Sequence, residues 1–131
     1  MSRSLASAKK AGATFEREVA DYLKNTLSDD RIDCRVKTGA KDKGDIGGLR
    51  TADGYRIVME CKNVSRDNLP AWIREAETER DNDGALVGVV CHKKHGSGNP
   101  GEQYVTLTLK AFATLLIDKP RFDTYVDGYT S

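Results

Sequence analysis

The chain has 131 residues, of which 31% are charged and 38% hydrophobic, and its formal net charge is +1. This length suits one domain with its own core, so we expect a single domain over residues 1–131, with a tail at 118–131 that is either loosely attached or docked on the body. No apolar run approaches the roughly 20 residues that span a bilayer, and the N-terminus lacks the apolar segment of a secretory signal. We therefore expect a soluble, cytoplasmic protein with no membrane partner.

Apolar residues recur at helical spacing from Ala13 to Leu27, which predicts an amphipathic helix that starts as early as about Ser4. Residues 31–37 alternate as a strand does, 38–44 read as a cationic loop, and 45–50 predict a second strand weakened by two glycines. A turn at "TADG" leads into a third strand over 55–63. These three strands predict a β-meander.

A second helix is predicted over 68–82, with Asp67 or Asn68 as its cap, an apolar stripe that includes Trp72 and Ala76, and an end near Gly84. Residues 85–93 are almost continuously apolar, as in an interior strand covered on both faces. An edge strand over 103–109 and a short helix over 110–117 follow. The expected fold is α/β, with the order α-β-β-β-α-β-β-α and a mixed sheet of about five strands flanked by helices.

Charge is unevenly distributed along the chain. Residues 67–83 hold six acidic residues and two arginines, a net charge of −4, while the remainder holds 19 basic and 14 acidic residues, a net charge of +5. A basic face with the acidic helix turned away from it would suit a polyanion, and ordinary solvated charge is the alternative. The three cysteines show no C-x-x-C spacing, which argues against a disulfide framework or a zinc knuckle.

The stretch "YRIVMECKNV" at 55–64 places charge inside an apolar strand. Alternate side chains of a strand share a face, so Glu60 and Lys62 point away from the face that carries Met59 and Cys61. Asp45 opens the preceding strand, and a suitable register would bring its carboxylate beside that of Glu60. Two adjacent carboxylates repel unless a positive charge lies between them, and a hard divalent cation would meet that need.

The first helix offers a third carboxylate. Glu16 lies at helical spacing from Val19 and Leu23 and borders the buried stripe, whereas Glu18 lies on the solvent side. Glu16 is therefore expected to face the sheet and to complete a metal site, through water if not directly.

These residues resemble a known family. Gly44 and Asp45, followed by "ECK" at 60–62, are similar to the PD-(D/E)XK nuclease signature, with Gly44 where that family often has proline. Over about residues 9–115, "GATFEREVADYL", "RVKTGAKDKGD", "IVMECKN" and "VVCHKKHG" resemble in order and spacing the archaeal and phage Holliday junction resolvase branch.

The resemblance implies a restriction-endonuclease-like core, Mg²⁺ or Mn²⁺ as cofactor, and a homodimer that cuts four-way DNA junctions during recombination in a prokaryotic cell or a phage-infected host. It implies catalytic positions at Glu16, Asp45, Glu60 and Lys62, with the three carboxylates holding the metal. Lys62 is expected to stay protonated, and to orient water or stabilise negative charge rather than act as a base.

A group of residues, most of them basic, is predicted to contact the DNA backbone: Lys9, Lys10, Arg17, Arg35, Lys37, Thr38, Lys41, Lys43, Lys93 and Lys94. The loop "GSGNPG" lacks the Gly-Lys-Ser/Thr ending of a P-loop, so no nucleotide cofactor is expected. Trp72 is expected in the core or a dimer interface, and His92 and His95 are expected to be solvated or to face phosphate.

Simpler interpretations remain open at this point. Asp45 could cap a turn, Glu60 and Lys62 could form an exposed pair, and Glu16 could pair with Arg17 or Lys9. The alternatives to a junction-resolving enzyme are another nuclease on the same core (restriction-like, nicking or single-strand exonuclease) and a non-catalytic DNA-binding module.

Overall fold

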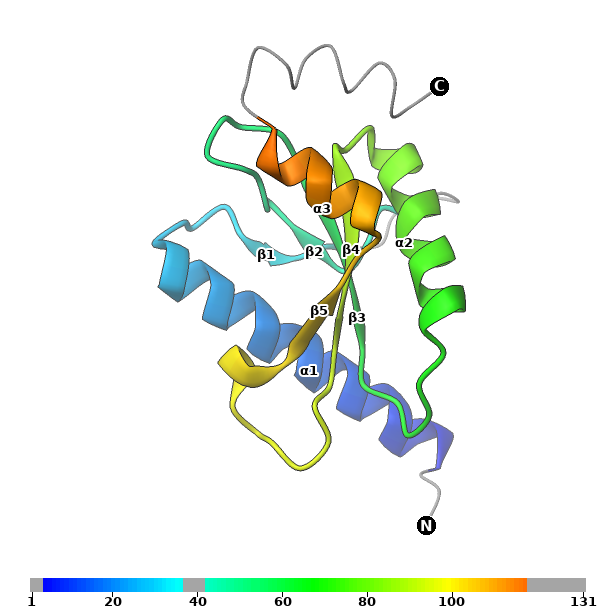
Figure 1. Cartoon of the computed structure of the whole chain (residues 1–131). Helices are drawn as coiled ribbons and strands as arrows, with labels where there is room; N and C mark the ends of the chain where they lie inside the picture. Colours follow the sequence, from blue (N-terminus) through cyan, green and yellow to red (C-terminus); the bar gives the residue numbers. More distant parts are fainter. Residues whose placement is uncertain (1–3, 37–41, 118–131) are drawn as a thin grey trace.

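The computed structural model describes residues 4–36 and 42–117. Lys37, Thr38, Lys41 and the predicted tail lie outside the described residues. The elements in chain order are α1 (Leu5–Leu27), β1 (Asp33–Cys34), β2 (Ile46–Gly47), β3 (Ile57–Lys62), α2 (Leu69–Asp83), β4 (Val87–His92), the short 3₁₀ turn η1 (Pro100–Glu102), β5 (Tyr104–Thr106) and α3 (Leu109–Leu116) (Figure 1). Apart from η1, this is the predicted order.

The five strands form one mixed sheet in the order β1-β2-β3-β4-β5. Strands β3 and β4 are parallel and are joined by the α2 crossover, and the other neighbouring pairs are antiparallel. The prediction of an α/β domain with a mixed five-stranded sheet is confirmed, including β4 as an interior strand with every residue buried and β5 at an edge.

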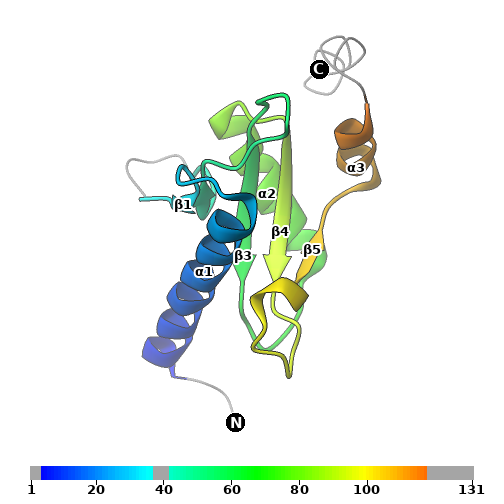
Figure 2. The ribbon, with the colours of Figure 1, turned by 90° about the vertical axis from the view of Figure 1, so that its left-hand side faces the viewer.

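The helices cover opposite faces of this sheet. Phe15 and Val19 of α1 pack in one core cluster with Met59 and Cys61, and α3 adds Ala111 to the same cluster. Trp72 and Ala76 of α2 pack against Val90 in a second cluster, which confirms Trp72 as a core residue. Figure 2 looks onto the sheet from the side of α1, with α2 behind it. Among the described helices, none has the length and apolar character needed to cross a membrane.

The first two strands are shorter than the sequence predicts, with two residues each. The backbone turns out of the ladder at Gly48, where φ is +84° and where a Cβ atom would lie 2.1 Å from the carbonyl oxygen of Arg31. Only glycine allows this close approach at a positive φ. The second of the two glycines therefore ends β2 and sets where the chain leaves toward the 51–54 turn.

Replacement of Gly48 by alanine is expected to lower the free energy of unfolding by about 2 kcal/mol or more, because a positive φ and a clash with backbone both oppose the new methyl group. Urea unfolding followed by circular dichroism measures the change. Gly98→Ala is the matched control, since nothing lies within 4 Å of the position that a Cβ atom would take there, and its effect should stay within about 0.5 kcal/mol. Equal stability of the two variants would contradict the assignment.

Candidate functional site

Strand β3 presents its charged residues to α2. In the parallel register, Val58 lies opposite Gly88, Glu60 opposite Val90, and Lys62 opposite His92. Since Val90 packs against Trp72 and Ala76 of α2, Glu60 and Lys62 share the face that α2 covers. Glu60 is 3% exposed, so its carboxyl group lies within the protein rather than in an exposed surface pair.

Asp45 lies beside Glu60. Ile46 pairs with Met59, so continuation of the antiparallel register sets Asp45 opposite Glu60. The Asp45 side chain is 2% exposed, and its Oδ2 accepts a hydrogen bond of 2.8 Å from the backbone N–H of Cys61. The backbone N–H of Asp45 donates to the carbonyl oxygen of Met59 at 2.9 Å. The carboxylates of Asp45 and Glu60 therefore lie side by side, as the sequence analysis expects for a suitable register.

Gly44, which precedes Asp45, stands where the signature that the chain resembles often has proline. Its φ is +93°, and a Cβ atom there would lie 2.8 Å from Cγ1 of Val58. Proline is restricted to a φ near −65°, so it could not adopt this conformation. The chain thus enters the Asp45 position by a backbone path that requires glycine.

Helix α2 adds two carboxylates to the same face. Glu75 forms an ion pair of 2.8 Å with Lys62, and Glu79 is 1% exposed beside Glu60. The predicted apolar stripe of this helix continues from Ala76 into Glu79, and this face packs on β3 and β4, so part of its acidic charge is buried.

Asp42, Glu60 and Glu79 form a group of carboxylates. One oxygen of each lies within 4.8 Å of the others. Asp42 is exposed, but its position is fixed: its Oδ1 accepts from the N–H of Gly44 at 2.9 Å, and its carbonyl oxygen accepts from the side-chain amide of Asn82 at 2.8 Å. The group therefore joins the segment before β2, the strand β3 and the helix α2.

The pKa values of this group are shifted because several acidic side chains lie close together. Burial, followed by the adjacent carboxyl groups of Asp45 and Glu79, raises the pKa of Glu60 far above its usual value. Burial also raises the pKa of Glu79, its contact with the carboxyl group of Glu60 opposes this shift, and the negative charges of Asp42 and Glu75 add to it. Without a bound cation, the repulsion among these carboxylates is therefore relieved by protonation of Glu60 and Glu79.

Lys62 remains a cation. Its partial burial opposes the charged form, yet the pKa of its ammonium group lies above the usual value because Glu75 contacts it and the charges of Glu60 and Asp45 are near. This agrees with the expectation that Lys62 stays protonated.

Glu16 lies on the other side of the sheet from α2. It is half-buried on α1, and its charge helps to raise the pKa values of the Cys34 and Cys61 thiols, for which burial is the largest cause. It does not belong to the group formed by Asp42, Glu60 and Glu79. Its role as a metal ligand stays a prediction.

Two of the predicted DNA contacts already have acidic partners. Arg17 pairs with Asp33 at 2.8 Å, and Arg35 pairs with Asp83 at 3.4 Å. Among the other predicted contacts that the structure describes, Lys94 lies 3.7 Å from Glu102, whereas Lys9, Lys10 and Lys43 are exposed.

Lys10 and Lys93 come together at the end of β3. They line a shallow hollow that also includes Asn63, the residue after β3, and Thr14 and Glu18 of α1. Lys10 comes from α1 and Lys93 directly follows β4, so two segments distant in sequence place positive charge beside Asn63, on the side of the sheet that α1 covers. These two lysines are predicted DNA contacts that the described structure places together.

His92 is buried, although the sequence predicts a solvated or phosphate-facing side chain. It is 6% exposed, its Nε2 lies 2.7 Å from Oγ1 of Thr106, and its ring lies between those of Trp72 and Tyr104 at centroid distances of 5.6 and 5.7 Å. It is therefore a packed residue and not a solvated one, because the parallel register carries it inward next to Lys62.

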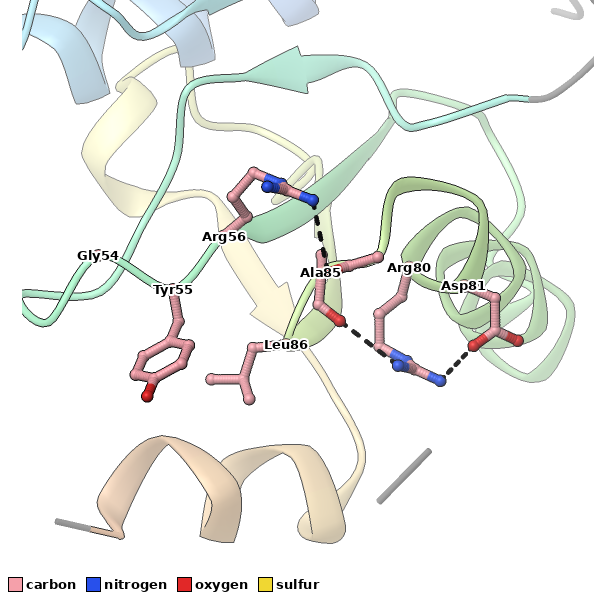
Figure 3. A pocket seen from close by; sticks show the side chains of 8 residues that line it. Gly54, Tyr55, Arg56, Arg80, Asp81, Ala85 and Leu86 are labelled. Carbon is pink, nitrogen blue, oxygen red and sulfur yellow. Dashed lines mark hydrogen bonds and ion pairs between the residues drawn. The ribbon is translucent and has the colours of Figure 1, made fainter. Parts of the chain in front are cut away.

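A separate hollow lies at the opposite end of β3 and β4 (Figure 3). Arg80 there donates to the carbonyl oxygen of Ala85 and pairs with Asp81, while Arg56 pairs with Asp83. The arginines of this hollow thus already have acidic partners, and the hollow has no assigned chemistry.

None of the family models, curated proteins or solved structures compared with the chain matches it. The resemblance to the nuclease signature rests on the residues of this chain.

Proposed function

We propose that this protein is a divalent-cation-dependent endonuclease that cuts branched DNA. The observation that carries the proposal is the position of Asp45, Glu60 and Lys62: two buried carboxylates face each other across a hairpin, with a charged lysine two residues along the same strand face. This combination is what the nuclease signature requires.

The donor set fits Mg²⁺ or Mn²⁺. Within the described residues, Oε2 of Glu60 and both carboxylate oxygens of Glu79 are buried without a hydrogen-bond donor. Buried carboxylates without donors are costly, and hard cations take such oxygens as ligands. Asp45 and Glu60 would hold the ion. The resemblance suggests that Glu16 acts through water, but α1 carries Glu16 on the face of the sheet away from α2, so the proposal does not depend on it. A bound ion would supply a water of lowered pKa and would offset negative charge on the phosphoryl oxygens.

The protein's own groups have distinct roles in this proposal. Lys62 would offset the charge that develops on the phosphate as water attacks, and Glu75 would hold its ammonium group at the end of β3. Lys10 and Lys93 would bind phosphates that pass the α1 side of the sheet and position the DNA without reading its sequence.

The proposal also specifies that the protein acts as a homodimer and that its substrate is a four-way junction. Two cuts in a nearly two-fold substrate suit two active sites related by a two-fold axis. Helix α3 offers an apolar surface for pairing, since Leu109, Phe112 and Leu116 are exposed on it. Trp72, which the sequence predicts in the core or a dimer interface, is buried in the core.

Cleavage of three labelled substrates tests the proposal: an immobile four-way junction, a linear duplex of the same sequence, and a single strand. Each is incubated with Mg²⁺, with Mn²⁺ and with EDTA. We expect paired symmetric nicks in the junction alone, and none in EDTA. Equal cutting of duplex or single strand would leave a nuclease of another kind. No metal-dependent cutting of any substrate would overturn the proposal in favour of a non-catalytic DNA-binding module.

A further inference from the structure

Glu79 is a buried acid for which the nuclease signature has no role. It is 1% exposed, and neither of its carboxylate oxygens has a hydrogen-bond donor among the described residues. No ion pair within this part of the chain reaches it; the cation nearest along the helix, Arg80, pairs instead with Glu77 and Asp81. A helix that packs on a sheet would usually place an apolar residue at this position.

The carboxylate of Glu79 is directed at two others. Glu60 approaches it from β3 and Asp42 from the segment before β2, with one oxygen of each within 4.8 Å of the others. An ion of calcium size, with ligands at 2.3–2.6 Å, accepts oxygens up to about 5 Å apart, and Mg²⁺ up to about 4.2 Å. The three groups therefore surround a space in which a divalent cation fits with little movement.

We infer that Asp42, Glu60 and Glu79 form a divalent-cation site between β3 and α2, in which Glu79 is the ligand supplied by the helix. Glu60 belongs both to this site and to the pair with Asp45, so the site adds two ligands to those of the signature. Cation binding itself does not depend on the proposed function; only its use in catalysis does.

The inference has a structural consequence. A cation at this site ties three segments that are distant in sequence, and it brings positive charge next to the face that carries Lys62. The packing of α2 on the sheet, and not only the hairpin, then determines whether the ion is held.

Calorimetric titration of the intact protein with Mn²⁺ tests the site, beside Glu79→Gln and the control Glu77→Gln. Glu77 lies one half-turn away on the same helix, and it pairs with Arg80. Glu79→Gln keeps the side-chain volume and removes the charge. We expect its Mn²⁺ affinity to fall about tenfold or more, and that of Glu77→Gln to stay within about twofold of the wild type.

Thermal unfolding in EDTA shows whether each variant is folded. If Glu79→Gln is not, Glu79→Asp retains the charge, withdraws the carboxylate by one methylene group, and should show the same loss of affinity. Wild-type affinity in either folded variant, or no Mn²⁺ binding by the wild type, would overturn the inference. Weakened Mn²⁺ binding without any DNA cleavage would support the site and refute the nuclease; cleavage with unchanged Mn²⁺ binding in Glu79→Gln would do the reverse.

Discussion

Replacement of Asp45 by asparagine is expected to reduce metal-dependent DNA cleavage by at least about a hundredfold. The change removes a ligand charge at the point where β2 meets β3, but little volume. The amide oxygen of asparagine can still accept the hydrogen bond that the Cys61 N–H donates to Oδ2 at 2.8 Å, so the fold should remain. Initial rates of junction cleavage with Mn²⁺ measure the effect, and gel-shift binding in EDTA should be unchanged.

Asp53→Asn is the matched control. Asp53 is exposed in the turn at 51–54, away from the acidic group, and its replacement should leave both cleavage and stability unchanged. Cleavage by Asp45→Asn at the wild-type rate would refute the assignment of this carboxylate, whichever DNA substrate the enzyme prefers.

The core of the site could be predicted from the sequence because its geometry is local. Alternation along β3 fixes which residues share a face, and a short hairpin brings Asp45 back to Glu60. The end of α2 at Gly84 and the burial of β4 follow from equally local patterns. In each of these cases a period of two or 3.6 residues is sufficient.

The contribution of α2 to the site could not be predicted from a local pattern. Extension of the stripe from Ala76 by one turn indicates Glu79 as an inward residue, but the high count of acids in this helix suggests a solvated surface. Tertiary packing decides between them, since the crossover from β3 to β4 sets α2 directly over Glu60. Asp42 was missed for a similar reason: its approach depends on the bond from Asn82, 40 residues away.

The acidic group also predicts an unusual dependence of stability on pH. Burial and adjacent carboxyl groups raise the pKa values of Glu60 and Glu79 in the folded state. Above the pKa of an unfolded glutamate, near 4.3, the folded protein therefore binds more protons than the unfolded chain. Stability falls as pH rises wherever this holds, by about 1.4 kcal/mol per pH unit for each extra proton. In EDTA, the free energy of unfolding should consequently be greater at pH 5.5 than at pH 8.

Urea unfolding from pH 5 to 8.5 measures this slope in the wild type and in Glu79→Gln, with and without Mn²⁺. Glu79→Gln should flatten the slope and stabilise the protein at pH 8 in EDTA, because it removes a buried charge that must otherwise be protonated. Mn²⁺ should stabilise the wild type most at high pH, since cation and protons compete for the same oxygens. Asp29 affects stability in a different pH range. Its hydrogen bond with Arg31 lowers the pKa of its carboxyl group to about 2, so its contribution to the free energy of unfolding is lost only below about pH 4. A wild-type stability in EDTA that is flat or rises between pH 5.5 and 8 would show that Glu60 and Glu79 are ionised without a cation.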